Sequence, residues 1–241
     1  MTKIYSEFAR VYHEMYQNIF DYKKEFEFYH KILKENFSTS ILEIGCGSGN
    51  LAQYFLETDY DYVGLDLSQE MLNIAKEVEP KAKFIQADMR DLKFQEKFDA
   101  VIISGRSFTY LTTNEDVHNT LISIYKVLEK EGILIFDNFN AEKIISYKKK
   151  HFKQKSEYNS RKYTRISVKT PNLKDGWTEN WEATYYIEEK AKKTKIFKDK
   201  SILRSFTKDE LKLFLSLHNF EIVKLIDQDI IFTIIARKKI N

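Results

Sequence analysis

The stretch Ile41-Leu-Glu-Ile-Gly-Cys-Gly-Ser-Gly-Asn50 decides the fold. It opens with a short apolar run typical of a buried strand, and three of the chain's seven glycines, Gly45, Gly47 and Gly49, follow within five residues. Residues 50–57 then carry apolar side chains at helical spacing. Glycines between a strand and a helix let the backbone approach a ligand closely. The spacing is G-x-G-x-G, whereas the dinucleotide-binding fingerprint G-x-G-x-x-G requires a glycine where this chain has Asn50.

Strands and helices alternate around this stretch. Apolar runs predict strands at 40–44, 62–65, 83–86, 98–103 and 132–136, and helical spacing predicts helices after the glycines, after Ser68 and at 114–130. This alternation indicates βαβ units and a mostly parallel sheet, whose ligand lies at the carboxyl ends of the strands. After a predicted helix at 207–218, strands at 220–226 and 230–236 are joined by about three residues, a connection short enough only for an antiparallel hairpin.

Two segments lie outside the alternation. Residues 141–206 carry predicted strands at 163–168, 181–188 and 194–203, and we interpret them as a small antiparallel β cap inserted after the fifth strand. At the N-terminus, apolar side chains recur every three or four residues from Tyr5 to Ile19 and form one face of a helix.

The predicted fold class is therefore α/β, with a Rossmann-like sheet of seven strands that is mostly parallel and ends in an antiparallel hairpin. We divide the chain into an N-terminal helical lid (1–35), a sheet domain (36–140 and 207–241) and the cap (141–206).

Two carboxylates end the strands that follow the glycines. Asp66 ends the second strand, 66 − 45 = 21 residues after Gly45, which is the distance at which a carboxylate meets ribose hydroxyls in nucleotide-binding βαβ units. Asp88 ends the third strand. Because the carboxyl ends of parallel strands share one edge of the sheet, we expect the glycines and both carboxylates to line one ligand site.

These segments resemble the class I S-adenosylmethionine-dependent methyltransferases over about residues 36–140. The resemblance implies that Asp66 accepts from the ribose hydroxyls of the cofactor, that Leu67 packs on its adenine and that Asp88 accepts from the adenine amino group. It places Ser104 beside the sulfonium. The other residues implied to contact the cofactor are Tyr22, Glu43, Gly45, Cys46, Gly47, Gly49, Met71 and Met89.

A narrower resemblance comes from three shorter segments. Phe8-Ala-Arg-Val-Tyr12, Asp21-Tyr22 and residues 204–210, with the antiparallel insertion, are similar to small-molecule methyltransferases, including amino-sugar N,N-dimethyltransferases and glycine N-methyltransferase-like enzymes. This implies methyl transfer to an amine or a hydroxyl of a small molecule, with S-adenosylhomocysteine as the product. Many relatives have Tyr-Asp where this chain has Tyr12-His13. Tyr12 and His13 are the catalytic candidates, His13 as a general base.

The charge distribution leaves alternatives open. The chain has 39 basic and 36 acidic residues, a net charge of +3, but residues 141–175 hold eleven basic against three acidic residues, or +8. Such a segment favours an acceptor with a phosphate or carboxylate, or an RNA-directed methyltransferase. The loop at 104–110 lacks the Asn/Asp-Pro-Pro-Tyr motif of enzymes that methylate base amino groups, so nucleic acid is disfavoured. A nicotinamide-dependent Rossmann oxidoreductase is a third alternative, disfavoured by Asn50 and the terminal hairpin.

The numbers and spacing of cysteine and histidine residues argue against a disulfide-stabilised protein and against a metal-binding protein. One cysteine, Cys46, excludes an internal disulfide, and the five histidines show no metal-ligand spacing, so no metal is expected. The N-terminus lacks the apolar stretch of a signal peptide, and no apolar run approaches the ~20 residues of a membrane helix. We expect a cytoplasmic protein that is a monomer or a homodimer and does not bind a membrane.

Overall fold

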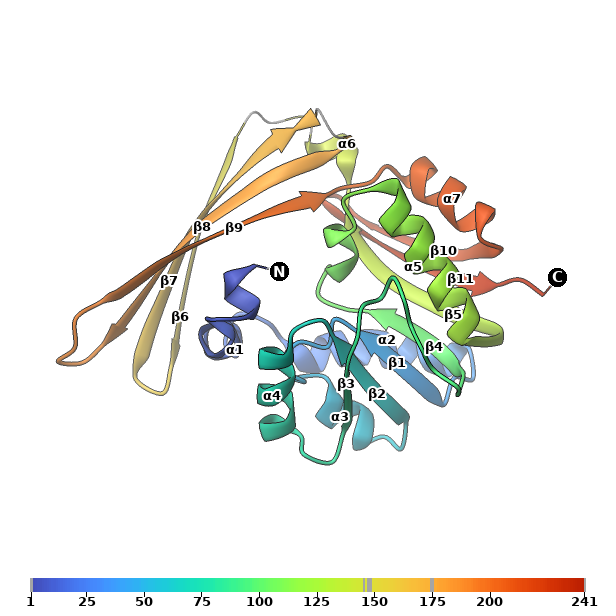
Figure 1. Cartoon of the computed structure of the whole chain (residues 1–241), viewed down its shortest axis with the longest axis horizontal. Coiled ribbons are helices and arrows are strands. Elements are labelled where there is room, and N and C mark those ends of the chain that lie inside the picture. Colours follow the sequence, from blue (N-terminus) through green and yellow to red (C-terminus); the bar gives the residue numbers. More distant parts are fainter. Residues whose placement is uncertain (1, 145, 147–148, 174–175, 241) are drawn as a thin grey trace.

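The computed structural model describes residues 2–144, 146, 149–173 and 176–240, which form two separate β-sheets (Figure 1). The larger sheet has seven strands in the order β10-β11-β5-β4-β1-β2-β3. Its strands are β1 (Ser40–Ile44), β2 (Asp61–Asp66), β3 (Lys83–Gln86), β4 (Phe98–Ile103), β5 (Leu128–Phe139), β10 (Phe220–Gln228) and β11 (Ile231–Lys238).

The pairing of this sheet confirms the predicted topology. Strands β1 to β5 run parallel, whereas β11 pairs antiparallel with both β5 and β10. The two residues between β10 and β11 allow only a hairpin, since a parallel crossover needs a dozen or more residues. The strand order reverses between β1 and β4, so the crevice for a ligand opens at their carboxyl ends.

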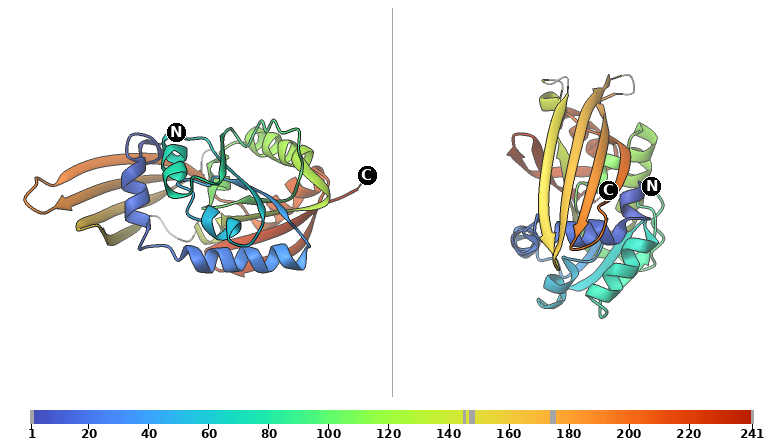
Figure 2. Two further views of the ribbon diagram at one scale, coloured as in Figure 1. Left: turned by 90° about the horizontal axis from the view of Figure 1, so that it is seen from below. Right: turned by 90° about the vertical axis from the view of Figure 1, so that its left-hand side faces the viewer.

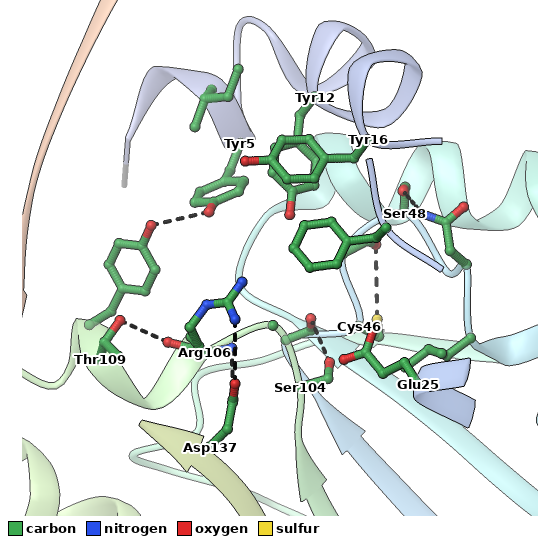
Figure 3. A pocket seen from close by; sticks show the side chains of 18 of the residues that line it. Tyr5, Tyr12, Tyr16, Glu25, Cys46, Ser48, Ser104, Arg106, Thr109 and Asp137 are labelled. Carbon is green, nitrogen blue, oxygen red and sulfur yellow. Dashed lines mark hydrogen bonds and ion pairs between the residues drawn. The ribbon is translucent and has the colours of Figure 1, made fainter. Parts of the chain in front are cut away.

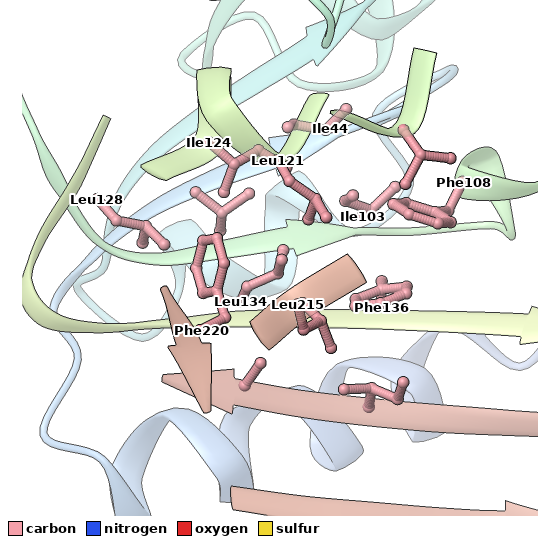
Figure 4. Close-up of a cluster of buried hydrophobic side chains, with 14 of the residues drawn as sticks. Ile44, Ile103, Phe108, Leu121, Ile124, Leu128, Leu134, Phe136, Leu215 and Phe220 are labelled. Atoms are coloured by element: carbon pink, nitrogen blue, oxygen red, sulfur yellow. The ribbon is translucent and has the colours of Figure 1, made fainter. Parts of the chain in front are cut away.

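Helices cover both faces of the sheet. On one face, α5 (Asn114–Val127) and α7 (Lys208–Leu217) bury side chains such as Leu121 and Leu215 against Leu134 and Phe136 (Figure 4). On the other face, α2 (Tyr22–Glu35) and α3 (Ala52–Leu56) pack on alternate residues of the same strands, including Ile41 and Ile135. Because each strand is buried on both sides, it reads as a continuous apolar run rather than an alternating one. The fourth long helix, α4 (Gln69–Val78), packs on β2 and β3.

The cap is an antiparallel sheet of four strands in the order β6-β7-β8-β9. They are β6 (Lys150–Tyr158), β7 (Arg161–Asn172), β8 (Thr178–Glu189) and β9 (Lys195–Arg204), and the short helix α6 (Ala141–Ile144) leads into them. Three strands were expected. The sequence of β6, Lys-His-Phe-Lys-Gln-Lys-Ser-Glu-Tyr, has too few apolar residues to signal a strand, and only pairing with β7 along its whole length makes it one.

The N-terminal segment lies between the cap and the sheet domain (Figure 2). The short helix η1 (Lys3–Tyr5) packs on β9, and α1 (Ala9–Tyr16) packs on α4 and β6. A backbone bond from Lys3 N to Asp199 Oδ1 (2.9 Å) and an ion pair between Glu14 and Arg161 join this segment to the cap. Since α2 packs on the sheet instead, the name "lid" below refers to residues 3–20 alone.

Among the residues that the structure describes, no helix is long and apolar enough to cross a membrane.

A pair of histidines joins the two helices of the α5–α7 face. His118 Nδ1 lies 2.7 Å from Nε2 of His218, the residue that ends α7. Burial, and next the charge of His118, lower the pKa of His218, so the folded protein disfavours the protonated form. The unfolded chain takes up this proton near the ordinary histidine pKa of about 6.5, and folding stability therefore falls as the pH drops through that value.

We predict that lowering the pH from 7.5 to 5.5 reduces the melting temperature less in His218→Gln than in the parent. Glutamine can still hydrogen-bond to His118 but gains no proton in the unfolded state. Thermal unfolding followed by circular dichroism at both pH values measures the difference. Because burial also lowers the pKa of His13 and His30, both proteins lose some stability in acid. If the melting temperature falls equally in the two proteins, protonation of His218 does not contribute to the loss of stability in acid.

Candidate active site

Two adjoining cavities open at the carboxyl ends of the parallel strands. We call them the Asp66 cavity, of about 300 Å³, and the Asp137 cavity, of about 230 Å³. Both are lined by the residues at their junction, which are Tyr5, Tyr12, Gly45, Gly47, Gly105 and Tyr110. One elongated ligand can therefore occupy both cavities by passing over the glycine loop.

The glycine loop needs its glycines at the junction. Gly45 has a φ of +75°, and a Cβ atom there would lie 2.1 Å from Ser107 Oγ. Gly47 has a φ of +55°. Both conformations are left-handed and favour glycine, and the missing side chains leave backbone exposed to the cavities.

Asp66, at the end of β2, lines the Asp66 cavity and supports the glycine loop. Its Oδ2 accepts from Gly47 N–H (2.9 Å) and its Oδ1 from Ser68 N–H (2.8 Å). Burial raises the pKa of Asp66, and the backbone hydrogen bonds oppose that shift. Each carboxylate oxygen has a second lone pair, so Asp66 can accept two more hydrogen bonds from a ligand.

Asp88 also lines the Asp66 cavity, but its carboxylate is paired with an arginine. Arg90 bridges both of its oxygens, with Nε 3.0 Å from Oδ1 and Nη2 2.6 Å from Oδ2. The hydrogen bond from Arg90 holds the pKa of Asp88 below its usual value. Leu67, Met71 and Met89 supply apolar lining beside these two carboxylates. Two acceptors next to apolar side chains suit a ligand with hydroxyls and a flat ring.

Glu43 lies in the wall of the Asp137 cavity and is 2% exposed. It accepts hydrogen bonds from the hydroxyls of Tyr62 (2.5 Å) and Ser104 (2.6 Å), which tie β1 to β2 and β4. Burial raises the pKa of Glu43 and also that of the Cys46 thiol. A thiol whose pKa is raised is a poor nucleophile, so Cys46 serves the loop as a small residue.

The lid supplies an aromatic wall over the junction (Figure 3). The rings of Tyr12 and Tyr16 stack with centroids 4.2 Å apart, and Tyr5 meets Tyr12 edge to face at 5.1 Å. The hydroxyl of Tyr110 donates to that of Tyr5 (3.1 Å), which links the lid to the loop after β4. Burial raises the pKa of Tyr5 and Tyr12 well above the usual value, so both phenols stay neutral.

Asp137 and Arg106 form a charged pair that the sequence analysis missed. Arg106 donates its backbone N–H to Asp137 Oδ1 (3.1 Å), and its Nη1 lies 3.7 Å from Oδ2 (Figure 3). Burial raises the pKa of Asp137, and Arg106 opposes the shift. The rule that singled out Asp66 and Asp88 also fits Asp137, because it follows the predicted strand at 132–136. No pattern in the sequence singled out Arg106 as a site residue.

The cap closes the Asp137 cavity from above. Its lining residues are Arg165, Lys169, Trp181, Tyr185 and Leu203. Lys169 Nζ is 2.5 Å from the buried carboxylate of Glu179, and Arg165 lies over the rings of Tyr16 and Trp181. Trp181 and Tyr185 are the aromatic residues that the cap contributes to the wall of this cavity.

The structure gathers most of the candidate residues at these cavities. Every residue expected to contact the cofactor lines one of them except Gly49, whose absent Cβ would lie 3.0 Å from Ala75 Cβ; this glycine lets α4 pack closely. Tyr12 lines both cavities. His13 lines neither cavity. Its Nδ1 is 3.0 Å from the hydroxyl of Ser48, and Ser48 lines the Asp137 cavity. The described residues include no group of three His, Cys, Asp or Glu that could hold a metal.

Comparisons with known proteins define the class. Residues 41–132 match the family model described as a methyltransferase domain. The chain is 37% identical over 135 residues to glycine/sarcosine N-methyltransferase of Aphanothece halophytica, covering 53% of this chain and 51% of the relative. It is 34% identical over 100 residues to dTDP-3-amino-3,4,6-trideoxy-alpha-D-glucopyranose N,N-dimethyltransferase of Streptomyces venezuelae, covering 42% of each. The chain thus spans about half the length of these curated relatives.

A solved structure extends the likeness to the whole fold. It is CalS10 of Micromonospora echinaspora, an amino pentose methyltransferase with S-adenosylmethionine bound. The TM-score is 0.75 at 17% identity, over 91% of this chain and 92% of that one. The fold is that of the class I S-adenosylmethionine-dependent methyltransferases, and residues 41–132 match a methyltransferase domain. The resemblance read from the sequence is confirmed.

We predict that Asp66→Ala weakens S-adenosylhomocysteine binding more than Asp88→Ala. Asp66 is half-buried and can accept from two ribose hydroxyls, whereas Asp88 is already bridged by Arg90 and is expected to meet one amino group. A hydrogen bond to a charged group is worth about 1.5–3 kcal/mol, so the expected losses are about 100-fold or more for Asp66 and about tenfold for Asp88. Calorimetric titration of both variants, each checked for its melting temperature, measures the order. Equal or reversed losses in folded variants mean that the carboxylates are wrongly assigned.

Proposed function

We propose that this chain is an S-adenosylmethionine-dependent methyltransferase that methylates an amine of a small molecule. The observation that carries the proposal is the junction of the two cavities at Gly45, Gly47 and Gly105. One side has the acceptors and apolar lining that adenosine requires. The other side is enclosed by the lid and the cap and has room for an acceptor.

The residues at the Asp66 cavity fit the cofactor. Gly47 exposes its backbone beside the carboxylate of Asp66, where a side chain would fill the space, and Met71 Cε lies only 3.3 Å from where that Cβ would be. Asp66 would hold the ribose, Leu67 and Met89 the adenine ring, and Asp88 its amino group. The hydroxyls, carboxylates and backbone groups at this cavity suit this organic cofactor and its product, S-adenosylhomocysteine.

When bound, the cofactor supplies a methyl group already activated by the positive sulfur. The protein's part is to align the acceptor with that methyl group and to exclude water. Orientation of this kind is worth up to ~7–11 kcal/mol in well-ordered model reactions. Tyr5, Tyr12 and Tyr16 close the junction from above, and Gly105 leaves open space below, since no atom lies within 4 Å of where its Cβ would be.

An amine fits the acceptor side better than a hydroxyl. An amine becomes nucleophilic by losing one proton at near-neutral pH, whereas an alcohol requires a much stronger base. Asp137, whose pKa burial raises, can take a proton from an ammonium group. The names of two matched relatives likewise describe N-methyltransferases.

The remaining catalytic candidates take different parts in this proposal. Tyr12 contacts the cofactor and acceptor through both cavities, together with Tyr22 in the Asp137 cavity. His13 acts on the site only through the hydroxyl of Ser48, because it lines neither cavity. The lowered pKa of His13, caused chiefly by burial, keeps it neutral at physiological pH.

We infer further that the acceptor is a small molecule rather than nucleic acid. The cap strands close the acceptor side, and a phosphate or carboxylate on the acceptor can reach Arg165 or Arg106 there. A single thiol, buried in the glycine loop, suits a reducing compartment such as the cytoplasm. Monomer and homodimer are both compatible with this site, which one chain completes.

We predict that the protein binds S-adenosylmethionine and S-adenosylhomocysteine but not nicotinamide dinucleotides, because its loop is G-x-G-x-G. With S-adenosylmethionine, glycine, sarcosine and a nucleotide-linked amino sugar form the first acceptor panel, with the matching hydroxyl sugar as the control. Calorimetry measures binding, and release of S-adenosylhomocysteine measures transfer. Tight NAD binding without S-adenosyl binding contradicts the cofactor assignment. Transfer to the hydroxyl sugar and not to its amine contradicts the acceptor class.

A further inference from the structure

Glu25 is a carboxylate of the Asp137 cavity that the sequence analysis did not single out. It lies in the first turn of α2 and reaches toward the strand ends, where Ser104 and Cys46 lie (Figure 3). None of the ion pairs among the described residues includes it; its hydrogen-bond partner is the buried Tyr29, one helical turn further along α2. The cavity therefore holds a carboxylate without a basic neighbour in direct contact.

The other two carboxylates of this cavity have more partners within the protein than Glu25 has. Glu43 accepts from the hydroxyls of Tyr62 and Ser104. Asp137 is held by the guanidinium and the backbone N–H of Arg106. Glu25 is thus the carboxylate of this cavity with the fewest partners, and a cation brought by a ligand can pair with it.

The electrostatics of Glu25 agree with this. Burial first, and then the charges of Glu43 and Asp137, raise the pKa of Glu25 to about 7, while Arg106 opposes the shift. A perturbed carboxylate in a cleft is typical of a functional position. A ligand cation beside it would restore the ordinary, ionised state, and binding that ligand would release the proton.

The position of Glu25 indicates which positive group of a ligand would lie beside it. With adenosine beside Asp66, the amino-acid end of the cofactor must pass Gly45 and Gly47 and enter the Asp137 cavity beside Cys46 and Ser104. Glu25 lies on this side, whereas Arg106 and Asp137 lie towards β5 and the cap (Figure 3). We propose that Glu25 accepts a hydrogen bond from the α-ammonium group of the cofactor's methionine end and so fixes the direction of the sulfonium. This inference rests on the proposed function.

The test compares two ligands and three proteins by calorimetry at pH 7.5. S-adenosylhomocysteine carries the α-ammonium group, and 5′-methylthioadenosine lacks the amino-acid end. Glu25→Gln removes the charge with little change of shape, and Glu27→Gln is the matched control, because Glu27 is exposed on the same helix. We expect Glu25→Gln to weaken S-adenosylhomocysteine about 10- to 100-fold and to leave 5′-methylthioadenosine unchanged. Glu27→Gln should change neither.

The pH dependence of the unaltered protein is a second measurement that needs no variant. With a carboxyl pKa of about 7, the Kd for S-adenosylhomocysteine should rise about eightfold from pH 7.5 to pH 6, because the ammonium requires the ionised carboxylate. The Kd for 5′-methylthioadenosine should stay constant over that range. Glu25→Gln should lose the dependence, and Glu27→Gln should keep it.

Three results would overturn the inference. In the first, Glu25→Gln weakens the binding of both ligands equally, which would mean that Glu25 maintains the shape of the site rather than contacting the ammonium group. In the second, it weakens neither ligand and raises only the KM of an acceptor amine, which assigns Glu25 to the acceptor. In the third, the Kd of the unaltered protein does not depend on pH. If the unaltered protein binds neither S-adenosyl ligand, it is the proposed function that fails, and this result is distinct from the other three.

Discussion

The glycine loop after β1 is tied to the neighbouring strand β2 by backbone hydrogen bonds, and the geometry of the whole site follows from them. The N–H groups of Gly45 and Cys46 both donate to the carbonyl of Leu65, at 2.7 and 3.0 Å, and Gly47 donates to Asp66. The backbone at Gly45 and Gly47, which donates two of these bonds, is in the left-handed conformation. Because the loop forms part of both cavities, any substitution that shifts it would displace both ends of a ligand at once.

The strand ends collect carboxylates that differ in their environment. Asp66 is stabilised by backbone donors, Glu43 by two hydroxyls, Asp88 by one arginine and Asp137 by another. Burial raises the pKa of Asp66, Glu43 and Asp137, whereas Arg90 lowers that of the more exposed Asp88. Environment rather than residue type therefore sets the protonation behaviour of these carboxylates.

The lid and the cap depend on each other for their buried surfaces. Ile4 and Met15 of the lid pack against Tyr163 and Tyr185 of the cap, and the stacked rings of Phe8 and Phe197 lie beside them. A single β-sheet must bury its apolar face against another element of structure. The lid, which covers the junction of the two cavities, is thus held in place by the cap, which lines the Asp137 cavity.

The sequence by itself determined the sheet, its order of strands and helices, and the terminal hairpin, because buried parallel strands produce continuous apolar runs and short connections leave one topology. It also identified the glycine loop, Asp66 and Asp88, since backbone shape and strand ends leave local signals. Their roles in binding stay predictions. Tertiary structure alone decided that β6 is a strand, that α2 belongs to the sheet domain, and that Gly49 serves helix packing. It also brought Glu25, Arg106 and Asp137 together from distant segments. The physical reason is that pairing of strands and the electrostatics of a buried carboxylate depend on neighbours in space, which the order of residues does not reveal.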